Sequence, residues 1–150
     1  MELSPMPQKD AEIIASWKYP EPYSFYDMTA DEEDYEEFIH YEKRSHHTYS
    51  VYGNGELIGF FTLTPIDRLT VDIGLGLRPD LTGKGYGGTF LDEGIKFAKR
   101  HYRADHFTLS VAVFNKRAIE VYLRAGFREL YTFLQKTNGS EYEFVKMKKP

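Results

Sequence analysis

Residues 69–88, Leu-Thr-Val-Asp-Ile-Gly-Leu-Gly-Leu-Arg-Pro-Asp-Leu-Thr-Gly-Lys-Gly-Tyr-Gly-Gly, decide the fold of this chain. The stretch begins as an apolar strand over residues 69–77, turns into a glycine-rich loop, and leads into an amphipathic helix over residues 87–100. A second apolar strand is predicted over residues 107–114. A strand, a helix and a strand in this order predict a crossover that brings two parallel strands together.

Two turn signals predict antiparallel hairpins around this crossover. Gly53-Asn54-Gly55 separates two stretches of alternating apolar residues, and an Asn-Gly turn favours a tight hairpin. Thr137-Asn138-Gly139-Ser140 indicates a second hairpin near the end of the chain. The strands predicted on this basis cover residues 47–52, 56–64, 127–136 and 141–147.

Apolar periodicity predicts three further helices, which cover residues 10–17, 29–43 and 115–125. Thr29 is expected to open the second, and the third has Asn115 as its N-cap and Gly126 just past its end. We therefore expect one α+β domain over residues 1–150, in three layers. Its central sheet should be mixed but mostly antiparallel, with about six to seven strands and helices on both faces.

Composition excludes several classes of protein. The 150 residues contain no cysteine, so disulfide scaffolds, thiolate zinc sites and cysteine nucleophiles are ruled out. No run of about 18 apolar residues exists, and the first residues carry no export signal, so we expect a cytoplasmic protein that does not bind membranes. The isoelectric point of about 5.7 disfavours nucleic acid as a partner. The histidines show no metal-ligand spacing, and no metal is expected.

Charge and aromatic residues are unevenly distributed along the chain. Residues 1–50 hold 12 acidic against 4 basic residues, whereas residues 51–150 hold 11 acidic against 15 basic. Nine of the 24 aromatic residues also lie in the first 50. An acidic, tyrosine-rich wall suits a cation through both charge and ring faces, so this segment predicts a cationic ligand. A plain solvated acidic helix is the alternative.

The loop that follows the first parallel strand is suited to binding phosphate. Its glycines let successive backbone N–H groups face one point, and the start of a helix adds positive potential. Lys84 adds a charge. The loop consists of Thr82, Gly83, Lys84, Gly85, Tyr86, Gly87 and Gly88.

Two nucleotide-binding motifs fit this loop poorly. Gly83, Gly85 and Gly88 satisfy the dinucleotide fingerprint G-x-G-x-x-G, but the loop follows its strand too loosely, and too little chain remains for two nucleotide-binding halves. A P-loop is excluded because no Ser or Thr follows Lys84 and no glycine stands five positions before Gly83. A glycine-rich turn without a ligand remains the alternative.

Two further features carry chemistry. Gly74 and Gly76 interrupt the strand before the loop, which indicates either a bulge or backbone groups at Leu75 and Leu77 left free for an amide-bearing ligand. Asn115 and Tyr122 are seven residues apart and share one helix face. A helix cap and a core tyrosine would explain that second pair without any function.

Together, the loop, the glycine-bearing strand and the Asn-to-Tyr helix resemble the GNAT-type N-acetyltransferase superfamily. The resemblance covers residues 56–147, which correspond to the acetyl-coenzyme A half, while residues 1–50 match in layout as the acceptor side. It implies that the loop from Thr82 to Gly88 holds the pyrophosphate of acetyl-coenzyme A. It also implies that Leu75, Gly76 and Leu77 bind the pantetheine amides and that Asn115 meets the pantetheine end.

The resemblance further implies a catalytic role for Tyr122, which would protonate the departing thiolate. Two positions depart from the family pattern: Thr82 replaces a Gln or Arg, and Ser110 replaces the Glu that some relatives carry. A carboxylate base must therefore come from elsewhere or be absent, and the alternatives are Asp72 or a water chain through Ser110 or tyrosine groups. The expected acceptor-binding residues are Trp17, Tyr23, Tyr26 and Asp72.

The predicted activity is direct acetyl transfer from acetyl-coenzyme A to a primary amine of a small molecule or peptide, without a covalent enzyme intermediate. The acceptor is expected to be cationic, and a homodimer is possible. A non-catalytic module that senses acyl-coenzyme A is the alternative, and a dinucleotide-dependent enzyme is a third hypothesis.

Overall fold

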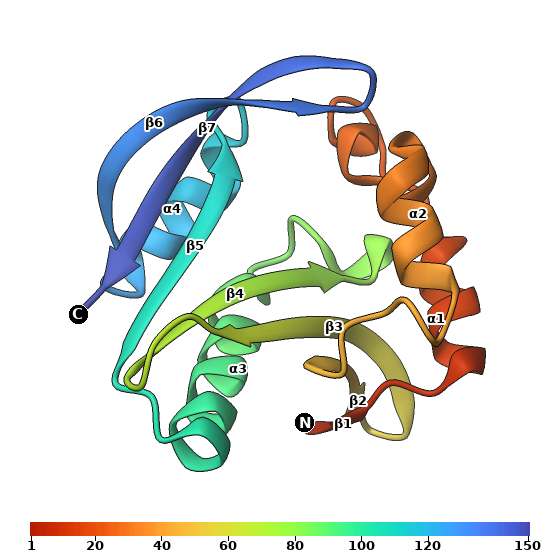
Figure 1. Ribbon diagram of the computed structural model, residues 1–150, viewed down its shortest axis with the longest axis horizontal. Coiled ribbons are helices and arrows are strands. Elements are labelled where there is room, and N and C mark those ends of the chain that lie inside the picture. The colour runs from red at the N-terminus through yellow and green to blue at the C-terminus, as the bar shows by residue number, and fades with distance from the viewer.

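The computed structural model describes residues 1–150 as one seven-stranded sheet with helices on both faces (Figure 1). The strands are ordered β1-β2-β3-β4-β5-β7-β6, and β4 and β5 are the one parallel pair. This confirms the predicted fold class and the crossover. The strands are β1 (Glu2–Pro5), β2 (Thr48–Gly53), β3 (Glu56–Pro65), β4 (Thr70–Leu77), β5 (His106–Ala112), β6 (Arg128–Thr137) and β7 (Ser140–Lys149).

Four α-helices cover the two faces of the sheet: α1 (Gln8–Ala15), α2 (Glu32–Ile39), α3 (Gly87–Tyr102) and α4 (Lys116–Arg124). Neighbouring residues of β3 point to opposite faces of the sheet, so their contacts show which helices cover which face. Phe61 stacks on Phe90 of α3, with ring centroids 4.6 Å apart, inside the main core. Phe60 packs instead against Phe38 of α2, with centroids 5.5 Å apart. α1 and α2 therefore lie on one face, and α3 and α4 on the other.

Turn and cap residues act as their chemistry predicts. Asn54 and Gly55 in one hairpin, and Asn138 and Gly139 in the other, all have positive φ, as a type I′ turn requires. At the start of α4, the side chain of Asn115 accepts a hydrogen bond of 3.1 Å from the backbone N–H of Ala118. Both predicted hairpins and the predicted cap of α4 are confirmed.

The acidic segment differs from the sequence prediction. Helix α2 is shorter than the expected residues 29–43, and Asp31 rather than Thr29 caps it, accepting a hydrogen bond of 2.9 Å from the backbone N–H of Asp34. Thr29 lies in a short 3-10 turn, Met28–Ala30, and a second such turn, Tyr23–Tyr26, comes before it. The edge strand β1 was not expected from the sequence.

Strand β6 forms the other edge of the sheet and exposes large apolar side chains on Leu130, Tyr131 and Leu134. An unpaired apolar edge of this kind can pair with another chain, and the homodimer stays a prediction. No helix in the structure is both long enough and apolar enough to cross a membrane.

Strands β4 and β5 separate halfway along their length. Their pairing covers Thr70 to Asp72 against His106 to Thr108 and then stops, although both strands continue. In Figure 1 the two strands move apart beyond this point, with α4 behind β5 on one side of the gap and α3 behind β3 and β4 on the other. The divergence places the candidate site at the middle of the sheet.

Candidate functional site

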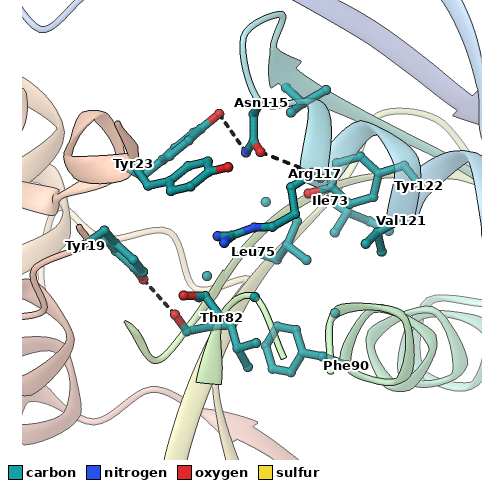
Figure 2. A pocket seen from close by; sticks show the side chains of 18 of the residues that line it. Tyr19, Tyr23, Ile73, Leu75, Thr82, Phe90, Asn115, Arg117, Val121 and Tyr122 are labelled. Carbon is teal, nitrogen blue, oxygen red and sulfur yellow. Dashed lines mark hydrogen bonds between the residues drawn. The ribbon is translucent and has the colours of Figure 1, made fainter. Parts of the chain in front are cut away.

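A cavity of about 600 Å³ opens where β4 and β5 separate (Figure 2). Residues from β4, the loop before α3, the start of α4 and the acceptor-side segment all line it. Of the residues predicted to bind the cofactor, acceptor or reacting groups, the cavity brings together Tyr23, Tyr26, Leu75, Gly76, Leu77, Thr82, Gly83, Gly85, Gly87, Ser110, Asn115 and Tyr122. Five other predicted residues do not line it: Trp17, Asp72, Lys84, Tyr86 and Gly88.

Backbone groups of β4 face the gap. The N–H of Arg78 donates to the carbonyl of Ile58 at 2.8 Å, and hydrogen bonds between antiparallel strands alternate, so Gly76 also pairs with β3. The backbone N–H and C=O of Leu75 and Leu77 then point toward β5, which has moved away. The hydroxyl of Tyr19 donates a hydrogen bond of 2.8 Å to the Leu77 carbonyl. Leu75 is therefore free, as predicted, whereas the carbonyl of Leu77 already has a partner.

The reason for Gly76 is packing rather than a ligand. A Cβ at this position would overlap the ring of Phe60 on the α1 and α2 face. The pairing of β3 with β4 is regular throughout, so the alternative of a bulge in β4 is wrong. A Cβ at Gly74 would approach Thr62 no closer than 3.6 Å, so that position has room.

The glycine-rich loop presents unpaired donors to the cavity. The backbone N–H groups from Gly83 to Tyr86 donate no hydrogen bond within the chain. Gly83 and Gly85 have φ of 71° and 86°, a conformation that L residues rarely adopt. Helix α3 then begins at Gly87 without a side-chain cap, so its first N–H groups are also open. This arrangement is typical of an anion site.

Tyr122 lies on the face of α4 that lines the cavity, and its side chain is half-buried. Its hydroxyl forms no hydrogen bond within the chain, and burial, with a smaller effect of the nearby Tyr26, raises its pKa above the usual value for tyrosine. The hydroxyl therefore keeps its proton through the neutral and mildly alkaline range. An unpaired protonated hydroxyl in a cavity can donate a proton to a developing anion.

Asn115 joins α4 to the acceptor side. Its side-chain oxygen caps the helix, and its amide nitrogen donates a hydrogen bond of 3.2 Å to the hydroxyl of Tyr26. Burial raises the pKa of Tyr26, which therefore stays neutral. Both polar atoms of the Asn115 side chain thus have partners within the chain.

The two predicted alternatives for a base lie in different surroundings. Ser110 lines the cavity from β5 and is exposed. Asp72 lies in the paired part of β4, where it accepts hydrogen bonds from Thr108 at 2.6 Å and from Lys146 at 3.1 Å. Because Asp72 is outside the cavity lining and already bonded to two partners, its predicted roles as base and acceptor ligand find no support.

On the acceptor side, Tyr23 and Tyr26 line the cavity, but Trp17 packs against the small core between α1 and α2. Sequence reasoning missed Tyr19 and Arg117, which also line the cavity. Tyr19 lies in the stretch Trp17-Lys18-Tyr19 of the acidic, tyrosine-rich segment, which was the available signal. Arg117 had no signal beyond its position two residues after Asn115.

A second, smaller cavity of about 220 Å³ adjoins the acceptor side. Its lining includes three carboxylates, Asp27, Asp31 and Asp34, and it shares Tyr26 and Met28 with the larger cavity. Backbone N–H groups of Asp34 and Asn138 lower the pKa of the Asp31 carboxyl. The smaller cavity is thus acidic. No group of three or more His, Asp or Glu side chains is arranged to hold a metal ion.

Comparisons with known proteins agree with this geometry. The sequence profile described as "Acetyltransferase (GNAT) family" matches residues 11–127. None of the curated protein sequences compared with this chain matches it.

Several solved structures share the fold. A chimera of spermidine N-acetyltransferase SpeG from Vibrio cholerae and hSSAT is 22% identical, with a TM-score of 0.78, and the match covers 99% of this chain and 93% of that one. The Vibrio cholerae spermidine N-acetyltransferase in complex with CoA and spermine is 19% identical, with a TM-score of 0.75 over 98% and 93% of the two chains. A GNAT family acetyltransferase from Bacillus anthracis is 16% identical, with a TM-score of 0.71 over 97% and 92%.

Proposed function

The chain belongs to the acetyltransferase (GNAT) family, and from this membership we propose that it transfers an acetyl group directly from acetyl-coenzyme A to a primary amine on a cationic small molecule or peptide. Enzymes of this family are N-acetyltransferases and use acetyl-coenzyme A as co-substrate. The residues that line the two cavities of this chain fit acetyl-coenzyme A and favour a cationic acceptor.

The observation that carries the proposal is the gap between β4 and β5. The unpaired N–H and C=O of Leu75 match the amides of an extended pantetheine arm. The free N–H groups from Gly83 to Tyr86 match a pyrophosphate at the start of α3. One cavity joins these two sets of groups to the hydroxyl of Tyr122. The residues present therefore fit acetyl-coenzyme A.

Tyr122 supplies the acid that the reaction needs. The amine nitrogen forms a bond to the acetyl carbon, the carbon–sulfur bond breaks, and Tyr122 donates its proton to the departing sulfur. The thiolate of a thiol with a pKa near 8.5 accepts a proton from a positioned tyrosine in a hydrogen bond, and the tyrosine regains a proton from water. The unpaired hydroxyl of Tyr122 also favours catalysis over the alternative of a sensor module, which would not need a proton donor.

The proton of the acceptor amine leaves through water and Ser110 in this proposal. The one carboxylate in the cavity lining is Glu120, and it is paired with Arg124 at 2.7 Å on the exposed face of α4. A primary amine with a pKa near 10.4 is neutral in roughly one molecule in 2,500 at pH 7. Without a nearby base, the rate should therefore rise with pH as the neutral amine becomes more common.

The acidic cavity supports an acceptor with a second positive charge. Because it shares Tyr26 and Met28 with the larger cavity, an extended diamine could react beside Ser110 and place its other ammonium near Asp27 and Asp34. Two of the structures that share the fold are spermidine N-acetyltransferases, and one contains spermine. A diamine or polyamine is therefore the acceptor class that we propose.

Thiol release tests the proposal. Purified protein with acetyl-coenzyme A should release coenzyme A with spermidine or a terminal diamine at least about tenfold faster than with a monoamine of equal length, because each ion contact contributes about 1.4 kcal/mol or more. Equal rates for diamines and monoamines would contradict the cationic acceptor. Binding of coenzyme A without thiol release from any amine would favour the sensor.

A further inference from the structure

Arg117 lies between the two halves of the site. Its guanidinium carbon is 4.1 Å from the centroid of the Tyr23 ring. Its Nη1 atom is 2.9 Å from the position that a Cβ of Gly83 would occupy, so it rests directly on the glycine-rich loop. Figure 2 shows the side chain extending from α4 into the cavity toward Tyr23. One side chain thus contacts both the acceptor side and the predicted phosphate loop.

The donors of Arg117 have no acceptor within the chain. Arg78 pairs with Asp80 at 2.6 Å and Arg124 pairs with Glu120 at 2.7 Å, but Arg117 forms no ion pair and donates no hydrogen bond. Stacking on an aromatic ring uses the face of a guanidinium and leaves the N–H groups at its edge free. A stacked arginine with free donors, beside the unpaired N–H groups from Gly83 to Tyr86, is arranged to bind phosphate.

Residues 19–26, here called the strap, carry the acceptor-side tyrosines across the cavity. Three contacts join the strap to residues that line the cavity: the hydroxyl of Tyr19 on the Leu77 carbonyl, the ring of Tyr23 against Arg117, and the hydroxyl of Tyr26 on the Asn115 amide. Outside the cavity, the carbonyl of Phe25 accepts a hydrogen bond of 2.9 Å from the Asn138 side chain. Arg117 and Asn115 belong to the same turn at the start of α4. Any restraint on Arg117 therefore passes directly to the strap.

We propose that Arg117 couples the two substrates: it donates hydrogen bonds to the phosphates of the co-substrate while it stays stacked on Tyr23, and so fixes the strap that forms the acceptor wall. This inference rests on the proposed function. The polyphosphate part of the co-substrate then strengthens acceptor binding, and by linkage the acceptor strengthens co-substrate binding by the same factor. Arg117 is a positioning residue with respect to the acceptor.

Hydrogen exchange of the strap tests this coupling without relying on turnover. Saturating coenzyme A should slow amide exchange over residues 19–26 in the wild-type protein. Pantetheine, which has the same amides and thiol but no phosphate, should occupy the β4 side at saturating concentration without slowing exchange in the strap. Equal protection by both ligands would overturn the inference.

Three variants separate the two contacts of Arg117. Arg117→Ala should weaken coenzyme A binding about tenfold in isothermal titration, the loss expected for charge-assisted hydrogen bonds, and leave pantetheine binding unchanged. Arg117→Lys keeps the charge but not the planar stack, so it should retain most of the coenzyme A affinity and lose strap protection. Tyr23→Leu should likewise keep coenzyme A affinity within about threefold and raise the acceptor KM, because it removes the ring on which Arg117 stacks and leaves the guanidinium donors in place.

Lys116→Ala is the matched control, since Lys116 is the exposed neighbour of Arg117 on the same turn. It should change neither coenzyme A affinity nor strap exchange. If Arg117→Ala binds coenzyme A as tightly as the wild type, the coupling fails while the proposed function stands. If the wild-type protein does not bind coenzyme A at all, the proposed function itself fails.

Discussion

The two ends of the β4–β5 pair share a backbone but differ in how their polar groups are paired. At the closed end, Asp72 of β4 accepts hydrogen bonds from Thr108 of β5 and Lys146 of β7. At the open end, beyond Asp72, the backbone of Leu75 and the hydroxyl of Tyr122 have no partners within the chain. The sequence offers Tyr122 as the acid and Asp72 as one of two alternatives for the base, and the pairing of their polar atoms in the structure supports only Tyr122.

This difference has a physical reason. An isolated polar group that is shielded from water costs about 1–3 kcal/mol when it lacks a partner, so a fold keeps such groups where a ligand supplies the missing contact. The closed end meets its own hydrogen-bonding needs and holds the sheet together. At the open end, hydrogen bonds from the substrates would pair the groups that the chain leaves unpaired. Removing a polar group at the open end should therefore lower activity, whereas removing one at the closed end should leave activity close to that of the wild type.

The largest effect is expected at the open end, from Tyr122→Phe. Removing the acid that protonates the leaving sulfur should lower kcat by at least about 10²-fold, while coenzyme A affinity stays within about threefold. The matched control is Tyr131→Phe, which removes a hydroxyl from an exposed tyrosine on β6 and should leave kcat unchanged. Steady-state thiol release measures both. Full turnover by Tyr122→Phe would show that Tyr122 is not the general acid, and the unpaired hydroxyl at the open end would then have no catalytic role.

The pH profile sharpens the same prediction. Because burial raises the pKa of Tyr122, the donor form persists as pH rises, while the acceptor amine becomes more often neutral. The value of kcat/KM should therefore increase from pH 7 to about pH 9 without a fall caused by Tyr122. A bell-shaped profile with an alkaline limb below pH 9 would show that another group supplies the proton.

Within the open end, alanine substitutions at Gly76 and Gly74 test whether the glycines of β4 are required for packing. Gly76→Ala forces a Cβ into the Phe60 ring, so it should lower the free energy of unfolding by about 2 kcal/mol and the Tm by about 5 °C. Gly74→Ala meets no atom closer than 3.6 Å and should change the Tm little. Calorimetry of both variants checks this. A stable Gly76→Ala protein would show that the Phe60 ring moves aside and that packing does not require glycine at this position.

At the closed end, Asp72→Asn should leave kcat/KM within about threefold of wild type, far from the 10²- to 10⁴-fold loss that follows removal of a general base. The amide oxygen still accepts from Thr108, and only the charge opposite Lys146 is lost, so the stability cost should stay below about 1 kcal/mol. A 10²-fold loss of kcat at an unchanged Tm would restore Asp72 as the base.

Much of the fold could be predicted from the sequence because it depends on local chemistry. The Asn54-Gly55 and Asn138-Gly139 turns fix two hairpins, and Asn115 fixes the start of α4, through contacts within a few residues. Strand β1 escaped prediction because its partner, β2, is more than 40 residues away in the chain.

The site was predictable only in part for the same reason. Tyr122 and the glycine-rich loop follow from a local pattern, whereas Tyr19 becomes a site residue through a hydrogen bond to Leu77, 58 residues away. The prediction of Asp72 as a base loses its support through a hydrogen bond from Lys146, which is 74 residues away in the chain. A sequence shows which groups could react, and long-range pairing decides which of them remain unpaired.

The smallest effect is expected beyond the closed end, where His47 precedes β2 and contacts the hydroxyl of Tyr102 at 2.8 Å. Burial, with the nearby His46 and His101, lowers the pKa of His47 below its ordinary value near 6.5. Since the unfolded chain then binds the proton more readily than the folded one, stability is retained above about pH 6.5 and lost as pH falls below it. The decrease in Tm from pH 7.5 to 5.5 should therefore be smaller in His47→Gln than in the wild type, with no difference between pH 7.5 and 9. An equal decrease in both proteins would mean that His47 takes up its proton in the folded protein without a cost in stability.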